Sequence, residues 1–263
     1  MALVETDLAN GVMTITLCDE ERRNALSAQL LSELVAAIDT VDRDPDIRVV
    51  VLTNRGNVFC AGANLAERSS GPGNSDANSA VGMGELFQRV RNSPKPFVGR
   101  IAGHCVAGGV GLAAVMDISI ALDSALFGFT EVRVGVVPAI ISVVCLPKMR
   151  VADAQSAFLR ANRFPASEAA RIGLINMAVS ADELDREVEA TINDLLAGAP
   201  HAIGVAKQLT TLVPSLAVDE ALTRMSELSA QLFASDEAHE GMSAYLEKRP
   251  ASWVRKLPSD ETN

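Results

Sequence analysis

Cysteines, aromatic residues and long apolar runs are all scarce in this sequence. Its 263 residues include 4 cysteines, 1 tryptophan and 1 tyrosine. The cysteines form no C-x-x-C pair, which argues against a zinc finger or a disulfide framework and predicts small buried thiols. No apolar run reaches the ~18 residues of a membrane-spanning helix, and the N-terminus lacks the basic and apolar regions of a signal peptide. We therefore expect a cytoplasmic protein that does not bind membranes.

Positive charge is scarce as well. The 23 lysines and arginines face 33 aspartates and glutamates, which gives a net charge of −10. Such a chain repels a phosphate backbone, so we expect no nucleic-acid partner. The 3 histidines, His104, His201 and His239, have no metal-ligand spacing, and no metal site is predicted. The sequence also lacks the G-x-S-x-G motif of serine hydrolases and the P-loop motif of nucleotide-binding proteins.

The pattern that is present predicts an α/β protein. Helix-like segments alternate with strand-like segments, which cover residues 11–17, 47–53, 97–101 and 117–122. The first helix is expected to begin after Ser27, its N-cap, and to end before Pro45, because the residue before a proline is pushed out of the helical region. Strands that are separated by helices pair in parallel, so we expect crossover connections.

Two stretches depart from this alternation. After about Pro165 nearly every segment has helical periodicity, so we expect no strand beyond that point. Residues 69–80 (SSGPGNSDANSA) contain too little apolar surface to order themselves. We expect a mobile loop there, of the kind that often lies beside a binding site.

Small residues gather in two further loops. Residues 102–111 (AGHCVAGGVG) lead into a short helix, and residues 59–65 (FCAGANL) follow a buried strand. Free N–H groups in such loops can hold a developing oxyanion, and open α/β folds bind ligands at the carboxyl ends of strands. Alternatively the glycines only allow close packing, and spacing alone does not decide between the two interpretations. The G-x-G-x-x-A match at residues 109–114 lies too close to the next strand to belong to a dinucleotide-binding unit.

Glu131 is the candidate general acid or base. The apolar neighbours Phe127, Phe129 and Val132 would raise its pKa by partial desolvation, which suits proton transfer near neutral pH. The alternative is a structural salt bridge to Arg133 or another neighbour, and the residues alone favour that alternative.

These segments, in this order, resemble the enoyl-CoA hydratase/isomerase family, also called the crotonase superfamily. The resemblance covers most of the chain, and the shared order is far more specific than any one segment. The matching segments are residues 23–27 (RNALS), 59–65, 103–117, 127–135, 137–138, 168–175 and 240–249.

The resemblance implies a crotonase-like α/β fold, a spiral of β-β-α turns with a C-terminal helical trimerisation region. Residues 1–200 would form the acyl-CoA-binding core, and residues 201–263 would form a helical oligomerisation region. The chain would assemble as a homotrimer or a dimer of trimers. The implied substrate is an acyl-CoA thioester, and no cofactor is implied because CoA is part of the substrate.

The resemblance also assigns site residues. Ala63 and Gly108 match the two backbone N–H donors that polarise the thioester carbonyl, and Glu131 matches the catalytic glutamate. The residues that match CoA contacts, the last two of them reaching a neighbouring subunit's CoA, are Arg23, Ala25, Ala61, Leu65, Tyr245 and Lys248.

Three positions differ from the usual pattern of the family. Gly111 stands where family hydratases usually carry a second glutamate, and Asn64 replaces the usual aspartate. Residues 139–142 (AIIS) replace a glycine-rich stretch and would narrow the floor of the pocket. A subset that hydrates branched, methylglutaconyl-type thioesters resembles this chain in these variants, so we favour a 2-enoyl-CoA hydratase that uses one glutamate. A Δ3-Δ2-enoyl-CoA isomerase, which needs one carboxylate, and a catalytically silent acyl-CoA-binding protein remain as alternatives.

Overall fold

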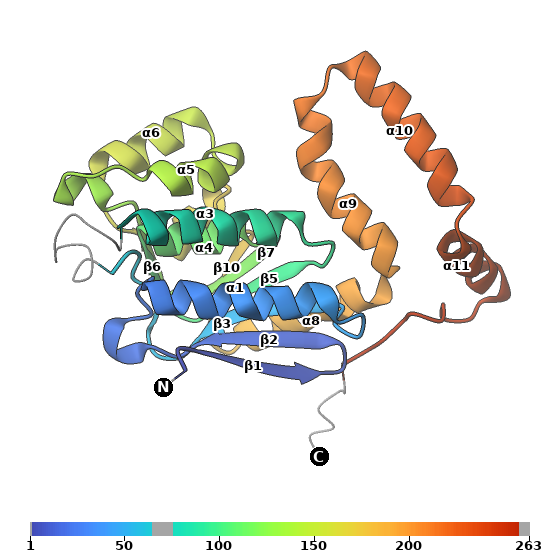
Figure 1. Ribbon diagram of the computed structural model, residues 1–263, viewed down its shortest axis with the longest axis horizontal. Helices are drawn as coiled ribbons and strands as arrows, with labels where there is room; N and C mark the ends of the chain where they lie inside the picture. Colours follow the sequence, from blue (N-terminus) through green and yellow to red (C-terminus); the bar gives the residue numbers. More distant parts are fainter. Residues whose placement is uncertain (1, 65–75, 258–263) are drawn as a thin grey trace.

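The computed structural model describes residues 2–64 and 76–257, and their strands form two sheets (Figure 1). The larger sheet has the strand order β1-β2-β3-β5-β7-β10, and the smaller sheet has the order β4-β6-β8-β9. The strands are β1 (Val4–Ala9), β2 (Val12–Leu17), β3 (Val49–Asn54), β4 (Val58–Cys60), β5 (Phe97–Ile101), β6 (His104–Val106), β7 (Ile118–Leu122), β8 (Leu126–Gly128), β9 (Phe164–Pro165) and β10 (Met177–Val179).

Helices cover these sheets and continue beyond them. The α-helices are α1 (Ala28–Arg43), α3 (Asp76–Asn92), α4 (Gly108–Val115), α5 (Ala139–Cys145), α6 (Val151–Arg160), α7 (Ala166–Arg171), α8 (Leu184–Ala197), α9 (Pro200–Leu212), α10 (Val218–Phe233) and α11 (Asp236–Glu247). Four short 3-10 turns are η1 (Glu20–Arg22), η2 (Glu131–Val134), η3 (Leu146–Lys148) and η4 (Val213–Ser215). None of the described helices is long and apolar enough to cross a lipid bilayer.

Parallel pairing dominates the larger sheet, as the sequence predicts. The pairs β2–β3, β3–β5, β5–β7 and β7–β10 are all parallel. Every residue of β3 is buried, which explains its unbroken β-branched and apolar sequence. The antiparallel strand β1 joins the edge through a hairpin whose two loop residues, Asn10 and Gly11, have φ values of 53° and 83°. Asn-Gly is the favoured sequence for such a left-handed turn.

Helix α1 forms where the sequence predicts it. The hydroxyl of Ser27 accepts a hydrogen bond from the N–H of Leu30 at 3.1 Å, so Ser27 is the N-cap. The helix ends at Asp44, one residue before Pro45. Its buried face packs into the main core and consists of Leu30, Leu31, Leu34, Ile38 and Val41.

Consecutive strands alternate between the two sheets. β3, β5 and β7 belong to the larger sheet, and the strands that follow them, β4, β6 and β8, belong to the smaller one. β4, β6 and β8 are neighbours and run parallel, so their carboxyl ends lie at one edge. The loop after β4, the start of α4 and the turn η2 therefore meet at that edge.

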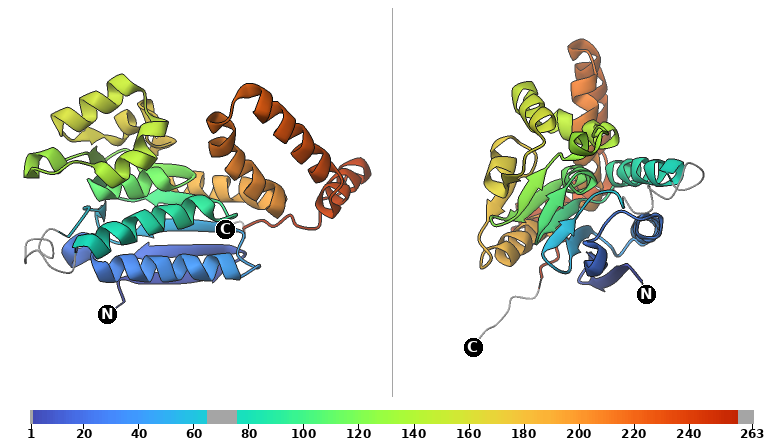
Figure 2. Two further views of the ribbon diagram at one scale, coloured as in Figure 1. Left: turned by 45° about the horizontal axis from the view of Figure 1, so that its top comes forward. Right: turned by 90° about the vertical axis from the view of Figure 1, so that its left-hand side faces the viewer.

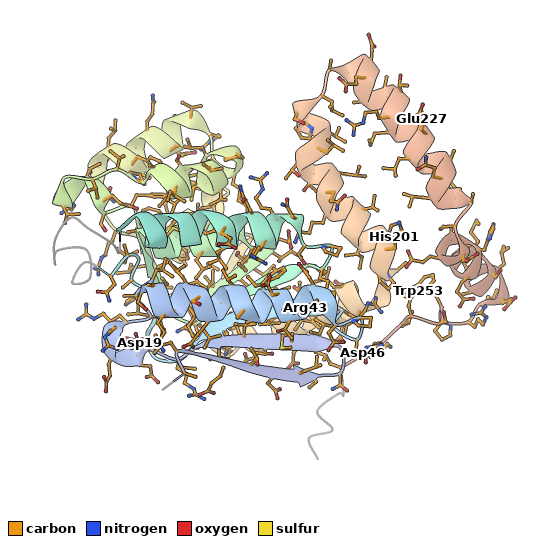
Figure 3. All side chains as sticks on the ribbon, viewed as in Figure 1. Asp19, Arg43, Asp46, His201, Glu227 and Trp253 are labelled. Atoms are coloured by element: carbon orange, nitrogen blue, oxygen red, sulfur yellow. The ribbon has the colours of Figure 1, made fainter. Side chains whose placement is uncertain are left out.

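Helices α9, α10 and α11, which we call the helical arm, extend to one side of the sheets (Figures 1 and 2). On α9, the ammonium of Lys207 donates to the carbonyl of Val90 at 2.7 Å and pairs with the carboxylate of Asp117 at 2.9 Å. At the other end of the arm, Trp253 lies between α9 and α11 (Figure 3). The guanidinium of Arg48 donates to the carbonyls of both Gly198 and Trp253, at 2.8 and 3.1 Å. The arm is thus fixed to the core at both ends.

Two sequence predictions about these elements are wrong. Strand β10 lies beyond Pro165, and it was missed because three residues are too few to show an alternating pattern; its identity comes from pairing with β7. Residues 76–80 belong to the start of helix α3 rather than to a loop, and the buried Met83 lies further along the same helix. The rest of the predicted loop, residues 69–75, lies outside the described residues.

Candidate active site

A cavity of about 540 Å³ opens where the loop after β4, the start of α4 and the turn η2 meet. Its walls are mostly small or apolar. Its lining includes Ala61 and Ala63 from the loop, Gly108 from α4, Glu131 from η2, and Ile140 and Ile141 from α5. All six are residues that the sequence singled out, Ile140 and Ile141 as part of the stretch 139–142, and the fold brings them together.

The two small-residue loops touch through their backbones. Gly62 has a φ of 86°, and a Cβ on it would lie 2.9 Å from the nitrogen of Gly108. A Cβ on Gly109 would lie 2.1 Å from the carbonyl oxygen of Cys60. Ala107, which precedes α4, takes a φ of 50° that a non-glycine residue rarely adopts. Close packing, one of the two interpretations of these glycines, is therefore real, and it also brings both loops to the cavity.

The backbone N–H groups of Ala63 and Gly108 make no hydrogen bond within the bridge or the helix to which each residue belongs. Gly108 is the first residue of α4, so its N–H has no acceptor within the helix. Ala63 forms a parallel bridge with Leu26, whose N–H donates to the carbonyl of Gly62 at 2.7 Å. In such a bridge the N–H of Ala63 points away from Leu26. Both residues line the cavity.

Glu131 presents an unsatisfied carboxylate oxygen at this cavity. It is the first residue of η2, a turn that ends at Gly135 with a φ of 79°. Its Oε2 atom is buried and has no hydrogen-bond partner. Burial raises the pKa of Glu131 above its ordinary value, because the charged form loses hydration. A raised pKa of this kind is typical of carboxyl groups that transfer protons.

The prediction that Glu131 forms a structural salt bridge is wrong. The guanidinium of Arg133 donates from Nε to the carbonyl of Ala161 at 2.7 Å, beyond the end of α6. Among the described residues no ion pair involves Glu131. Arg133 therefore ties the turn η2 to α6 and leaves the carboxylate unpaired.

Buried thiols lie beneath the loops. All four cysteines are free. Cys60, Cys105 and Cys145 are buried as predicted, whereas Cys18 is partly exposed, contrary to the prediction. Cys60 and Cys105 are paired in register on β4 and β6. Desolvation raises the pKa of Cys60 to about 12, so its thiol stays protonated and is a poor nucleophile.

At Gly111, where family hydratases usually carry a second glutamate, the space for a side chain is filled by Ile141 of helix α5. A Cβ on Gly111 would lie 2.4 Å from Cγ2 of Ile141 and 3.0 Å from Cζ of Phe87. Ile141 itself lines the cavity and is only 3% exposed. Phe87 was not anticipated, because its contact with α4 joins residues that are distant in the sequence. The valines that form the cavity's outer wall, Val134, Val136 and Val137, were not predicted as site residues either, although they stand out in the sequence as an apolar run.

The residues predicted to contact CoA lie in different places. The carbonyl of Arg23 accepts from the N–H of Ala61 at 3.1 Å, and the buried Ala25 follows in the same segment, so both lie beside the loop after β4. Leu65 lies outside the described residues. Tyr245 is 83% exposed on α11, and Lys248 caps the same helix. Helix α11 lies far from α5 along the molecule (Figures 1 and 2), so these two do not reach the cavity of their own chain.

Comparisons with known proteins show the family to which the chain belongs. The profile of the enoyl-CoA hydratase/isomerase family matches residues 7–256. The chain is 31% identical to the crotonyl-CoA hydratase of Syntrophomonas wolfei over 239 residues, 89% of this chain and 90% of that protein. It is 28% identical to the short-chain-enoyl-CoA hydratase of Clostridium acetobutylicum over 240 residues, 90% of this chain and 92% of that protein. The solved structure of the enoyl-CoA hydratase of Mycobacterium smegmatis superposes with a TM-score of 0.90 at 28% identity, covering 95% and 98% of the two chains. The chain therefore belongs to the enoyl-CoA hydratase/isomerase family, the crotonase superfamily.

Proposed function

We propose that this protein adds water to a 2-enoyl-CoA thioester with Glu131 as its one acid–base group. The observation that carries this proposal is the buried, unpartnered Oε2 of Glu131 in the same cavity as Ala63 and Gly108. A carboxylate with no protein partner is free to bind a water or a substrate proton. Two convergent N–H groups are suited to a carbonyl oxygen that gains negative charge.

In this proposal the N–H groups of Ala63 and Gly108 bind the thioester carbonyl. The carboxylate of Glu131 removes a proton from water, whose oxygen bonds to C3 of the enoyl group. The π electrons of the C2–C3 bond move to form an enolate, which the two N–H groups stabilise. Glu131, now protonated, returns its proton to C2 and is regenerated. In other enzymes one such donor is worth about 3–4 kcal/mol of transition-state stabilisation.

The assembly and the CoA contacts belong to the same proposal. We propose a homotrimer or a dimer of trimers in which residues 201–263 mediate association. Large apolar side chains on the helical arm, such as Leu222 at 63% and Phe233 at 65%, are exposed in the single chain, which supports such a contact. Tyr245 and Lys248 would then reach CoA bound by a neighbouring subunit, while Arg23, Ala25 and Ala61 would contact CoA within the chain.

A Δ3-Δ2-enoyl-CoA isomerase is the second candidate. The contact between Ile141 and Gly111 favours it, because moving a proton between two carbons of the substrate needs only one carboxylate. Hydration with one glutamate requires that group to act as base and then as acid. The two reactions differ in substrate, so one assay distinguishes them.

The test follows the ultraviolet absorbance of the conjugated thioester. Wild-type protein and Glu131→Gln are each mixed with crotonyl-CoA, with 3-methylglutaconyl-CoA and with a 3-enoyl-CoA. Loss of absorbance with either conjugated substrate, in the wild type alone, supports hydration at Glu131 and reports whether the branched methylglutaconyl-type thioester is accepted. A rise with the 3-enoyl-CoA identifies the isomerase. Binding of all three without any change in absorbance refutes both and leaves a silent acyl-CoA-binding protein.

A further inference from the structure

Ile141 of α5 and Gly111 of α4 pack as one unit at the inner end of the cavity. A Cβ placed on Gly111 would lie only 2.4 Å from Cγ2 of Ile141. Residue 111 therefore has no room for a side chain unless Ile141 moves. Ile141 is 3% exposed and Met83, which also lines the cavity, is 5% exposed, whereas the wall residues Val134, Val136 and Val137 are 58%, 53% and 68% exposed. Ile141 therefore lies at the closed end, and the valines lie at the mouth.

The charge of the residues that line the cavity indicates which acyl groups it can bind. Among the described residues that line it, Glu131 is the only one with a charged side chain. A carboxylate on the acyl chain would lose its hydration here without gaining a cationic partner, and it would face the negative charge of Glu131. An uncharged acyl chain loses nothing of this kind and gains contact with the apolar walls.

We propose that Ile141, seated on Gly111, closes the inner end of this site and so limits the length of the acyl chain, and that the site selects uncharged acyl chains because its described lining offers no cationic side chain. The inference rests on the proposed function only in taking acyl-CoA thioesters as the ligands. It gives α5 a role in substrate specificity, which is separate from the chemistry at positions 111 and 131. It also disagrees with the methylglutaconyl-type substrate that the family resemblance favours, because that acyl group is acidic.

The experiment measures binding rather than turnover. Isothermal titration calorimetry gives the Kd of butanoyl-, pentanoyl-, hexanoyl-, octanoyl- and glutaryl-CoA for the wild type, Ile141→Ala and Val144→Ala. These saturated thioesters are neither hydrated nor isomerised, so binding is read without catalysis. Val144 is the matched control because it is buried in the same helix but does not line the cavity.

We expect Ile141→Ala to lower the ratio of the octanoyl-CoA Kd to the butanoyl-CoA Kd by at least ~10-fold, since one methylene in an apolar pocket is worth about 10–200-fold. Val144→Ala should leave this ratio unchanged. The wild type should bind pentanoyl-CoA at least ~10-fold more tightly than glutaryl-CoA, since a buried unpaired charge costs more than a methylene. If Ile141→Ala does not fold, Ile141→Val, which removes one carbon, should move the ratio in the same direction.

Equal ratios in wild type and Ile141→Ala, or an equal shift in Val144→Ala, would overturn the inference about Ile141. Glutaryl-CoA binding as tightly as pentanoyl-CoA would overturn the selection of uncharged chains. A protein that shows the expected ratios but does not turn over any 2-enoyl-CoA refutes the proposed hydratase alone. A protein that hydrates crotonyl-CoA but shows unchanged ratios refutes the specificity inference alone.

Discussion

Replacing Gly109 by alanine tests how closely helix α4 approaches strand β4. The new Cβ would lie 2.1 Å from the carbonyl oxygen of Cys60 and 2.8 Å from its carbonyl carbon, whereas ordinary contact begins at 3.4 Å. Both atoms belong to the backbone, so no side-chain rotation relieves the clash. The start of α4 must move by about 1 Å, and the N–H of Gly108 moves with it.

The expected loss follows from two opposing effects. Overpacking a well-packed site costs about 1–3 kcal/mol, and replacing glycine by alanine within a helix returns about 0.5–1 kcal/mol. Because the new Cβ clashes with backbone atoms, which cannot rotate away, we take the upper end of the overpacking cost. The expected net destabilisation is ~2 kcal/mol. For a domain of this size, that lowers the melting temperature by about 4–8 °C. Displacing the N–H of Gly108, one of the two proposed oxyanion donors, should also lower kcat by about 10²–10³.

Gly111→Ala is the matched comparison on the same helix. Its new Cβ meets side-chain atoms, Cγ2 of Ile141 at 2.4 Å and Cζ of Phe87 at 3.0 Å. Adding Ile141→Ala removes the nearest of these atoms and should recover part of the stability lost, a non-additivity that is typical of residues in contact. The same second substitution should not rescue Gly109→Ala. Thermal unfolding followed by circular dichroism measures all of these variants. A melting temperature of Gly109→Ala equal to that of the wild type would refute the close approach of α4 to β4.

Three further predictions concern charge. Because burial raises the pKa of Glu131 and the base must be ionised, kcat/KM should fall with decreasing pH through a pKa above the ordinary glutamate range; a lower acid limb in the pH–rate profile would contradict this. The raised pKa also means that ionised Glu131 destabilises the fold at neutral pH, so Glu131→Gln should be more stable than wild type in urea at pH 7 and lose that advantage near pH 4. Lys207→Met leaves the carboxylate of Asp117 and two backbone carbonyls without their ammonium partner, and it should lower the free energy of unfolding by ~3 kcal/mol; equal urea midpoints would show that α9 is held by other contacts.

Local patterns predicted those parts of the fold that local interactions determine. Helix α1 with its cap Ser27 and strand β5 follow from periodicity and capping within a short window. Strand β10 could not be predicted in this way, because three residues become a strand only by pairing with β7. The same holds for residues 76–80, whose helical state depends on apolar residues further along α3.

The candidate site was predictable in its residue types but not in its contacts. The small residues of the two loops and the apolar neighbours of Glu131 were visible in the sequence. The partner of Arg133 was not, because it is the backbone carbonyl of Ala161, a group that every residue carries. The filling of position 111 by Ile141 was equally hidden, since it depends on how α5 crosses α4.

The guanidinium of Arg48 joins the two ends of the helical arm. Its donors reach Gly198, just before the arm begins, and Trp253, just after it ends. Helix α9 is also held to the core by Lys207, so the part of the arm that leaves the sheets and returns without further attachment described above is α10 and α11. Closing a loop costs free energy that grows only slowly with its length. An arm in which α10 and α11 differ in length or sequence can therefore replace this one without altering the strands that hold the cavity, as long as α9 keeps Lys207. These two helices are thus the natural place for exchange by evolution or by design.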